Sequence, residues 1–246
     1  MEIQVFVFNY DHFWQAKDLY DQFEKLGYET YLLNCESPND PVFEATSHII
    51  KLPNVYYSGQ WNIMLSKLIG DIAFITNADV IVPDIPRLME RLERAYARNN
   101  IGLYAPNLAW TPWTYNPSLL PSIGDGLFQV PATDSTIWSV LSEIALKVGP
   151  LNLNINNLGW GIEVLAAWLC HKHDKKVVRD YGIKCIHPHA TAYDRNLADT
   201  QFHNWTSNLG LGVDFWEYYN SREKYGFPYE GDDTDFLKNQ SRKTLL

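Results

Sequence analysis

The stretch that decides the fold is Asp71-Ile72-Ala73-Phe74-Ile75-Thr76-Asn77-Ala78-Asp79-Val80-Ile81-Val82. Residues 72–76 are continuously apolar or β-branched, which is typical of a strand covered on both faces. Such strands belong to α/β proteins, and open α/β sheets bind their ligands beyond the carboxyl ends of the strands. Asp79 is therefore the first candidate site residue. Asn77 and Asp79 also suit a simple turn, and the stretch by itself favours that alternative.

Length and charge narrow the class of protein. A chain of 246 residues suits one α/β domain with an appendage. The 20 Lys and Arg residues and 29 Asp and Glu residues give a formal charge of −9, which repels nucleic acid and anionic membranes. A nucleic-acid partner is therefore disfavoured. No window is apolar enough for a transmembrane segment, and the sequence leaves peripheral association with a membrane open.

The start of the chain and its cysteines bear on the compartment. Met1 leads directly into the apolar run 3–8, without the basic and apolar regions of a secretory signal, so we expect a cytoplasmic protein. The cysteines have no paired spacing, so we expect them to be reduced. They are Cys35, Cys170 and Cys185.

Apolar patterns of strand and helix alternate along the chain, which predicts βαβ units and a mixed, mostly parallel sheet flanked by helices. Strands are expected at 3–8, 28–33, 48–52, 55–57, 72–76, 101–105 and 126–131, with a hairpin at 177–181 and 183–186. Helices are expected at 11–26, 61–69, 85–99, 137–148 and 164–173. The connection at 106–121 is a long loop rich in Trp and Pro.

Two aromatic segments are candidates for ligand contact. The loop 106–121 carries Trp110 and Trp113, and aromatic faces stack on the apolar faces of sugars. The run Gly159-Trp160-Gly161-Ile162-Glu163 opens a helix. Its two glycines leave the backbone open to a ligand, with Trp160 and Glu163 at one wall. A carboxylate in a first helical turn also has a purely structural explanation in the helix dipole.

Two histidines follow the final predicted strand. They are His187 and His189, in the run His187-Pro188-His189-Ala190-Thr191-Ala192-Tyr193. Alternate residues of a strand point to opposite faces, so only one of the two would face a site. A histidine pair of this kind is more often structural than metal-binding.

Five segments, taken in their order along the chain, resemble the GT-A glycosyltransferases, especially the family 2-like enzymes of the rhamnosyl- and galactosyltransferase type. The resemblance covers roughly residues 3–194. Asn34-Cys35-Glu36-Ser37 resembles the turn that contacts the nucleotide base, and Gln60-Trp61-Asn62 resembles an Asn-bearing helix start. Gly70 to Val80 resembles a variant of the DxD motif.

The last two segments resemble the parts of the family that carry the chemistry. Gly159-Trp160-Gly161-Ile162-Glu163 resembles the segment that supplies the acceptor-activating base in inverting members. The run that begins at His187 resembles a closing segment whose first His is a metal ligand.

The resemblance implies a domain organisation and a set of donor-binding residues. Residues 1–199 would form a GT-A (Rossmann-like) domain. Residues 200–246 would form an aromatic-rich C-terminal extension packed on it, with a frayed tail. The donor-binding residues that it implies are Asn9, Tyr10, Asn34, Asn62, Asn77 and Asp79.

The implied activity is transfer of a hexosyl or deoxyhexosyl unit, with inversion, from a UDP- or dTDP-linked donor to a hydroxyl of a glycan or small glycoside. Glu163 would be the general base. A divalent cation, Mn²⁺ or Mg²⁺, would bind Asp79 and His187, and a nitrogen ligand favours manganese. Asn77 would be a weaker ligand and His189 an alternative to His187. Acceptor contacts would come from Trp110, Trp113 and Trp160.

Two departures from the family pattern keep other functions open. Asn77 is neutral, and Val164 stands where the family has a second acid. A non-catalytic carbohydrate- or nucleotide-binding module on the same fold is one alternative. A glycosyltransferase that acts on modified nucleic-acid bases is another, which the acidic charge disfavours.

Overall fold

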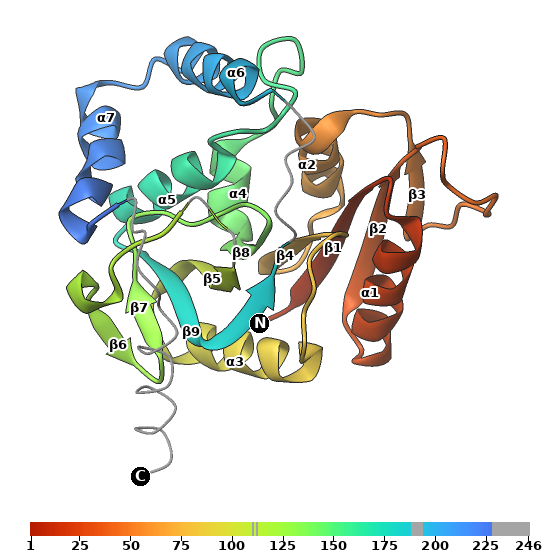
Figure 1. Ribbon diagram of the computed structural model, residues 1–246, viewed down its shortest axis with the longest axis horizontal. Helices are drawn as coiled ribbons and strands as arrows, with labels where there is room; N and C mark the ends of the chain where they lie inside the picture. The colour runs from red at the N-terminus through yellow and green to blue at the C-terminus, as the bar shows by residue number, and fades with distance from the viewer. Residues whose placement is uncertain (110, 112, 188–193, 228–246) are drawn as a thin grey trace.

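A mixed sheet forms the centre of the protein in the computed structural model, which describes residues 1–109, 111, 113–187 and 194–227 (Figure 1). The spatial order of its strands is β3 (Ile49–Leu52), β2 (Glu29–Cys35), β1 (Ile3–Tyr10), β4 (Ile72–Asn77), β8 (Ile137–Leu141), β5 (Ile101–Ala109), β9 (Lys176–Ile186), β7 (Leu127–Gln129) and β6 (Ser122–Gly124). The pairs β3–β2, β2–β1, β1–β4 and β5–β9 are parallel, whereas β8, β7 and β6 pair antiparallel. The predicted mixed, mostly parallel sheet is therefore confirmed.

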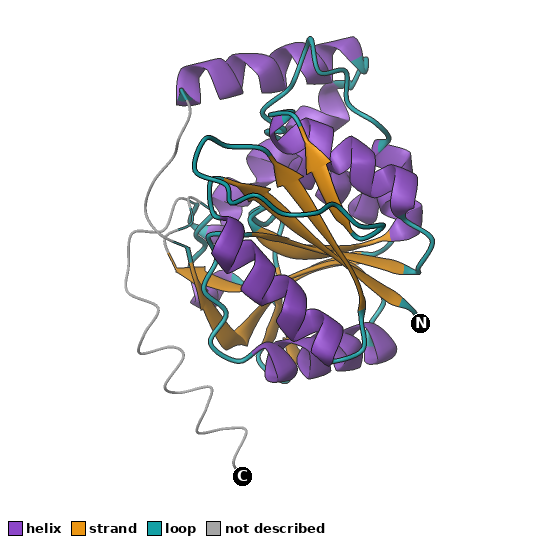
Figure 2. Cartoon of the chain, turned by 90° about the vertical axis from the view of Figure 1, so that its right-hand side faces the viewer, coloured by secondary structure: helices purple, strands orange, loops and turns teal. Residues whose placement is uncertain are grey.

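Helices cover both faces of this sheet (Figures 1 and 2). One face carries α1 (Phe13–Lys25) and α3 (Ile85–Arg98). The other face carries α2 (Tyr56–Lys67), α4 (Ser142–Val148), α5 (Ile162–Lys172), α6 (Arg195–Asn208) and α7 (Val213–Asn220). A short 3₁₀ turn, η1 (Pro117–Leu119), lies between β5 and β6, and another, η2 (Ser221–Tyr225), follows α7. In the described part of the chain, no helix is both long and apolar enough to cross a membrane.

Strand β4 is buried on both faces, as its continuous apolar run predicts. Its side chains alternate between two cores, because successive residues of a strand point to opposite faces. Phe74 packs with α1 and α3, whereas Ala73 and Ile75 pack with the helices of the other face. The strand ends at Asn77, so Asp79 follows at the carboxyl edge of the sheet.

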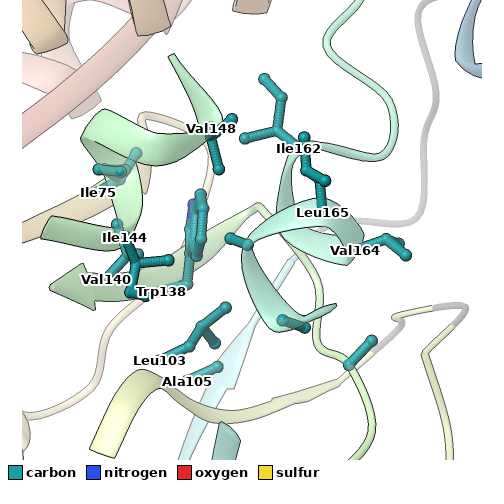
Figure 3. Close-up of a cluster of buried hydrophobic side chains, with 14 of the residues drawn as sticks. Ile75, Leu103, Ala105, Trp138, Val140, Ile144, Val148, Ile162, Val164 and Leu165 are labelled. Atoms are coloured by element: carbon teal, nitrogen blue, oxygen red, sulfur yellow. The ribbon is translucent and has the colours of Figure 1, made fainter. Parts of the chain in front are cut away.

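The larger core surrounds Trp138, which is fully buried (Figure 3). Its indole stacks on Trp61 of α2, with ring centroids 5.9 Å apart, and its Nε1 donates to the Tyr57 hydroxyl at 3.1 Å. Side chains of β5, α4 and α5 close the cluster; those in view include Leu103, Ile144, Ile162 and Leu165. This core fixes the start of α5 relative to the sheet.

The helix predicted for 137–148 is wrong in its first half. Residues 137–141 form β8, which pairs antiparallel with both β4 and β5, and only residues 142–148 are helical. A short apolar run fits either period, so sequence alone does not distinguish a buried strand from a buried helix. Residues 137–141 form a strand because β4 and β5, which lie on either side, both hydrogen-bond to it.

The hairpin predicted for residues 177–186 is a single strand, β9, parallel to β5. The break in the sequence pattern is a bulge rather than a turn. Pro106 pairs with Asp180 but Asn107 pairs with Lys184, so β9 carries residues 181–183 in addition.

Two other boundaries differ from the predictions. Residues 55–57 are not a strand, since α2 begins at Tyr56. The division placed between residues 199 and 200 falls inside α6, because this helix packs on the same core as α5.

A buried ion pair holds the bulge in β9. Arg91 of α3 donates from Nε and Nη2 to the two carboxylate oxygens of Asp180, each at 2.6 Å. Asp180 also accepts from the Tyr104 hydroxyl and the Gly182 N–H, both at 2.7 Å. A Cβ at Gly182 would lie 2.3 Å from the guanidinium, so the close approach of Arg91 requires glycine there.

Replacing Arg91 by Met should lower the free energy of unfolding by about 3–5 kcal/mol, because Asp180 would stay buried without its cation. Chemical denaturation measures this loss. The matched control is Lys172→Met, which breaks an exposed pair with Asp214 and should cost less than about 1 kcal/mol. Equal losses in the two variants would contradict the role of the buried pair.

Candidate functional site

Asp79 and His187 meet at the carboxyl edge of the sheet. Asp79 follows β4 and His187 follows β9, two strands that β8 and β5 separate. The His187 Nε2 lies 3.0 Å from the Asp79 Oδ2. A β-bridge beside them joins Ile81 to Ile186, with N–H to carbonyl distances of 2.8 and 3.0 Å. The bridge fixes both backbones, so the two side chains face each other.

This pair is electrostatically matched. Burial acts to raise the pKa of Asp79, but the hydrogen bond and the charge of His187 outweigh it, and the pKa lies below its ordinary value. The hydrogen bond to Asp79 raises the pKa of His187, against the opposing effect of burial. The pair therefore favours a carboxylate beside an imidazolium in the free protein.

The same pair could hold a divalent cation. Ligand atoms bound about 2.1 Å from one cation at right angles lie about 3.0 Å apart, and the carboxylate and imidazole atoms have this spacing. Asn77 ends β4 with a buried amide oxygen that has no hydrogen-bond partner among the described residues. The described ranges contain no group of three or more His, Cys, Asp or Glu side chains suited to a metal ion.

Amide side chains gather at the carboxyl ends of β1 and β2. Asn9 and Asn34 are paired in register, and the Asn9 Nδ2 donates to the Asn34 Oδ1 at 2.5 Å. Asn34 donates in turn to Asp40 at 2.7 Å. The Gln60 Oε1 accepts from the Asn9 N–H at 2.9 Å. Sequence reasoning missed Asp40, whose only signal is its place in the polar loop after β2.

Two other residues predicted to bind the donor differ in their surroundings. Tyr10 follows Asn9 on β1 and is 46% exposed, so its ring is accessible to a ligand. Asn62 lies within α2 and bonds through both amide atoms to the backbone of Leu151, at 2.8 and 2.9 Å. Asn62 thus connects α2 to the segment after α4, and Gln60 is the residue of this run that reaches Asn9.

Glu163 lies in the first turn of α5, and its side chain is buried. One carboxylate oxygen, Oε2, has no hydrogen-bond partner among the described residues. Burial raises the pKa of Glu163 to about 8, with a further contribution from the negative charge of Asp134, while Ser135 and backbone N–H groups oppose the shift. Glu163 is therefore largely protonated at neutral pH in the free protein.

The two glycines before Glu163 are required, but not to admit a ligand as predicted. Both have positive φ, 78° at Gly159 and 88° at Gly161. A Cβ at Gly159 would lie 2.7 Å from the Tyr57 ring, and one at Gly161 would lie 2.1 Å from the Phe202 ring. Protein side chains occupy this space, and they fix the direction in which α5 begins.

Of the predicted acceptor-binding residues, Trp110 lies outside the described residues, as does the alternative metal ligand His189. The Trp113 carbonyl accepts from the Arg179 Nη1 at 2.6 Å, and its ring lies 5.2 Å from the Arg222 guanidinium. Trp160 is partly buried, and its carbonyl accepts from Asn156 at 2.9 Å. The aromatic side chains thus stay candidates for acceptor contact.

The turn 134–136 connects the two parts of the site, and sequence reasoning missed it. The Thr136 carbonyl accepts from the Asn77 N–H at 2.8 Å. The Ser135 carbonyl accepts from the Tyr57 hydroxyl at 2.8 Å, and the Ser135 side chain acts to lower the pKa of Glu163. The structure therefore brings the Asp79–His187 pair and Glu163 to the same edge of the sheet, on either side of this turn.

Substituting Asp79 or His187 by Ala should weaken Mn²⁺ binding at least tenfold, because each variant would remove one of the proposed protein ligands. Electron paramagnetic resonance of free Mn²⁺ measures the affinity. The control is His203→Ala, which removes an exposed histidine that also pairs with an aspartate. Unchanged Mn²⁺ affinity in both site variants would refute the cation site.

The Glu163→Gln variant should gain stability relative to the wild type as pH rises. The folded-state pKa of Glu163, about 8, lies above its ordinary value, so the folded protein binds more protons than the unfolded chain between about pH 4.5 and 8. The stability contributed by the protonated carboxyl is complete below this window and is lost through it. Urea unfolding of both proteins at several pH values tests this, and a difference independent of pH would contradict it.

No family model and no curated protein sequence matches this chain.

Several solved structures are similar to this one. The structure of GalNAc-T7 with UDP, GalNAc and Mn²⁺ is 12% identical in sequence, with a TM-score of 0.57, over 99% of this chain and 54% of that chain. The mannosyltransferase PcManGT from Pyrobaculum calidifontis, in complex with GDP-Man and Mn²⁺, is 10% identical, with a TM-score of 0.56, over 100% of this chain and 81% of that chain. Glucosyl-3-phosphoglycerate synthase from Mycobacterium tuberculosis, with Mn²⁺, UDP-glucose and phosphoglyceric acid, is 14% identical, with a TM-score of 0.52, over 86% of this chain and 80% of that chain. This chain thus spans about half the length of the GalNAc-T7 chain, and it has the fold of the GT-A glycosyltransferases.

Proposed function

We propose that the protein is a metal-dependent glycosyltransferase that moves a sugar from a nucleotide-sugar donor to a hydroxyl acceptor. The observation that carries this proposal is the Asp79–His187 pair at the carboxyl edge of a GT-A sheet, with the buried carboxyl of Glu163 at the same edge. The structures that share the fold support it, because they hold Mn²⁺ with UDP, GDP-Man or UDP-glucose.

The residues present fit a divalent cation. Asp79 and His187 would hold it, and the unpartnered amide oxygen of Asn77 lies at the end of the same strand. A nitrogen ligand suits Mn²⁺ better than Mg²⁺, which prefers oxygen and water. When bound, the cation would neutralise charge on the diphosphate leaving group.

The donor would lie along the carboxyl ends of β1, β2 and β4. Asn9 and Asn34 are buried there and bonded to each other and to Asp40. Their amides would exchange these bonds for bonds to the edge of a nucleotide base. The exposed ring of Tyr10 could stack on the base. We propose that the donor bound at this edge of the sheet is a UDP- or dTDP-linked hexose or deoxyhexose.

Glu163 would be the general base of an inverting transfer. As the acceptor oxygen bonds to the anomeric carbon, its proton passes to the Glu163 carboxylate and the bond to the diphosphate breaks. A base with a pKa near 8 accepts a proton more readily than an ordinary carboxylate. Val164 is 2% exposed and belongs to the hydrophobic core (Figure 3), so Glu163 is the acidic residue of this turn that serves the site.

Replacing Glu163 by Gln should lower the rate of sugar transfer at least about 100-fold without changing the affinity for the donor. The assay first screens UDP-, dTDP- and GDP-linked sugars with Mn²⁺ for binding and for donor hydrolysis, and then tests glycan and glycoside acceptors. In the wild type, transfer should rise with pH through the pKa of Glu163 near 8. The matched control is Glu143→Gln, in the first turn of the neighbouring helix α4, which should keep transfer.

Two outcomes would count against this function. Equal transfer rates in Glu163→Gln and the wild type would refute the role of Glu163 as base. Binding of a nucleotide sugar without turnover, with every acceptor and at every pH, would favour a non-catalytic carbohydrate- or nucleotide-binding module on the same fold.

A further inference from the structure

Asp134 is an acidic residue at the centre of the site that no sequence motif indicates. It lies in the connection between β7 and β8, and its side chain is half-buried. Strand β8 runs antiparallel to its neighbours, so its amino end lies at the edge where β4 and β5 end. The connection therefore delivers Asp134 to the edge that carries Asp79 and Glu163.

Hydrogen bonds from Thr111, after β5, and from Thr136, before β8, hold the Asp134 carboxylate in place. Its Oδ2 accepts from the Thr111 hydroxyl at 2.7 Å, and Thr111 follows the end of β5. Its Oδ1 accepts from the Thr136 N–H at 2.7 Å and also from the Thr136 hydroxyl. These donors are neutral, so they orient the carboxylate and leave its charge uncompensated.

The turn that carries Asp134 touches both parts of the site. Thr136 bonds to the backbone of Asn77, two residues before Asp79. The Ser135 carbonyl accepts from the Tyr57 hydroxyl, and the Tyr57 ring lies beside Gly159, just before α5. The turn therefore connects the end of β4, which precedes Asp79, with the segment that leads into α5, which carries Glu163.

The charge of Asp134 reaches groups on two elements. It raises the pKa of Glu163 on α5 and of Tyr57 on α2. No ion pair among the described residues includes Asp134. The other groups that face Glu163 are the Tyr57 hydroxyl, the Ser135 side chain and the N–H groups at the start of α5. All of these are neutral.

We propose that Asp134 is a positioning residue of this site, a fixed negative charge that acts on the carboxyl group of Glu163. A like charge nearby makes the Glu163 carboxylate a stronger proton acceptor. Asp134 acts through Glu163 and needs no contact with the reacting atoms. The inference rests on the proposed role of Glu163 as base.

The test measures the titration of Glu163 directly, without donor or acceptor. Full-length protein labelled with ¹³C at glutamate carboxyl carbons is titrated by NMR, and the resonance absent from Glu163→Gln identifies Glu163. In Asp134→Asn the titration midpoint should fall by at least about 0.5 pH unit, because the like charge is removed. The control Thr111→Val removes a hydrogen bond but keeps the charge, and should shift the midpoint by less than about 0.2 unit.

A Glu163 midpoint in Asp134→Asn equal to that of the wild type would overturn the proposal. So would an equal shift in Thr111→Val, since the hydrogen bonds rather than the charge would then be responsible. If Asp134→Asn does not fold, as judged by circular dichroism, Asp134→Ser replaces it, because serine also suits a residue that bonds to the backbone two residues on.

The experiments distinguish failure of the proposed role of Glu163 as base from failure of the proposed role of Asp134. A shifted midpoint in Asp134→Asn, together with unchanged transfer in Glu163→Gln, would refute Glu163 as base but support the electrostatic action of Asp134. Loss of transfer in Glu163→Gln, without any shift in Asp134→Asn, would refute the role of Asp134 alone.

Discussion

The buried pair of Arg91 and Asp180 is the interaction on which the geometry of the site depends. It holds the bulge that adds residues 181–183 to β9. Beyond the bulge, Ile186 pairs with Ala109 and bridges to Ile81, and the next residue, His187, then faces Asp79. A buried ion pair adds little net stability, because desolvation offsets the attraction between the charges. Its contribution here is the register of the strand.

The acidic groups of the site have opposite electrostatic environments. Asp79 has an imidazole partner that keeps it ionised, whereas Glu163 is buried beside the like charge of Asp134 and keeps its proton to higher pH. The difference follows from the elements that carry them. Asp79 lies at an open strand end, while Glu163 is enclosed by the helix start, Tyr57 and the turn before β8. One site therefore combines a carboxylate that stays ionised with a carboxyl group that loses its proton near pH 8.

The high aromatic content of the chain, 14%, serves the site mainly through packing. The rings of α6 and α7 form a cluster that includes Phe202, Phe215, Trp216 and Tyr219. Phe202 fills the space beside Gly161 at the start of α5. The C-terminal extension thus supports the helix turn that carries Glu163, in addition to any contact with an acceptor. Aromatic composition alone does not distinguish these roles, since both need the same side chains.

The sequence by itself determined the buried strand β4, the α/β class, and Asp79, Glu163 and His187 as candidates, because these depend on local periodicity and on residue types at strand and helix ends. Only the tertiary structure decided that residues 137–141 form a strand and that residue 182 lies in a bulge. It also decided that Asp134 lies between the two parts of the site. A short apolar run fits more than one period, and the pairing of a strand and the partners of a polar group are set by residues far away in the chain. Such long-range contacts produce no local pattern in the amino-acid sequence.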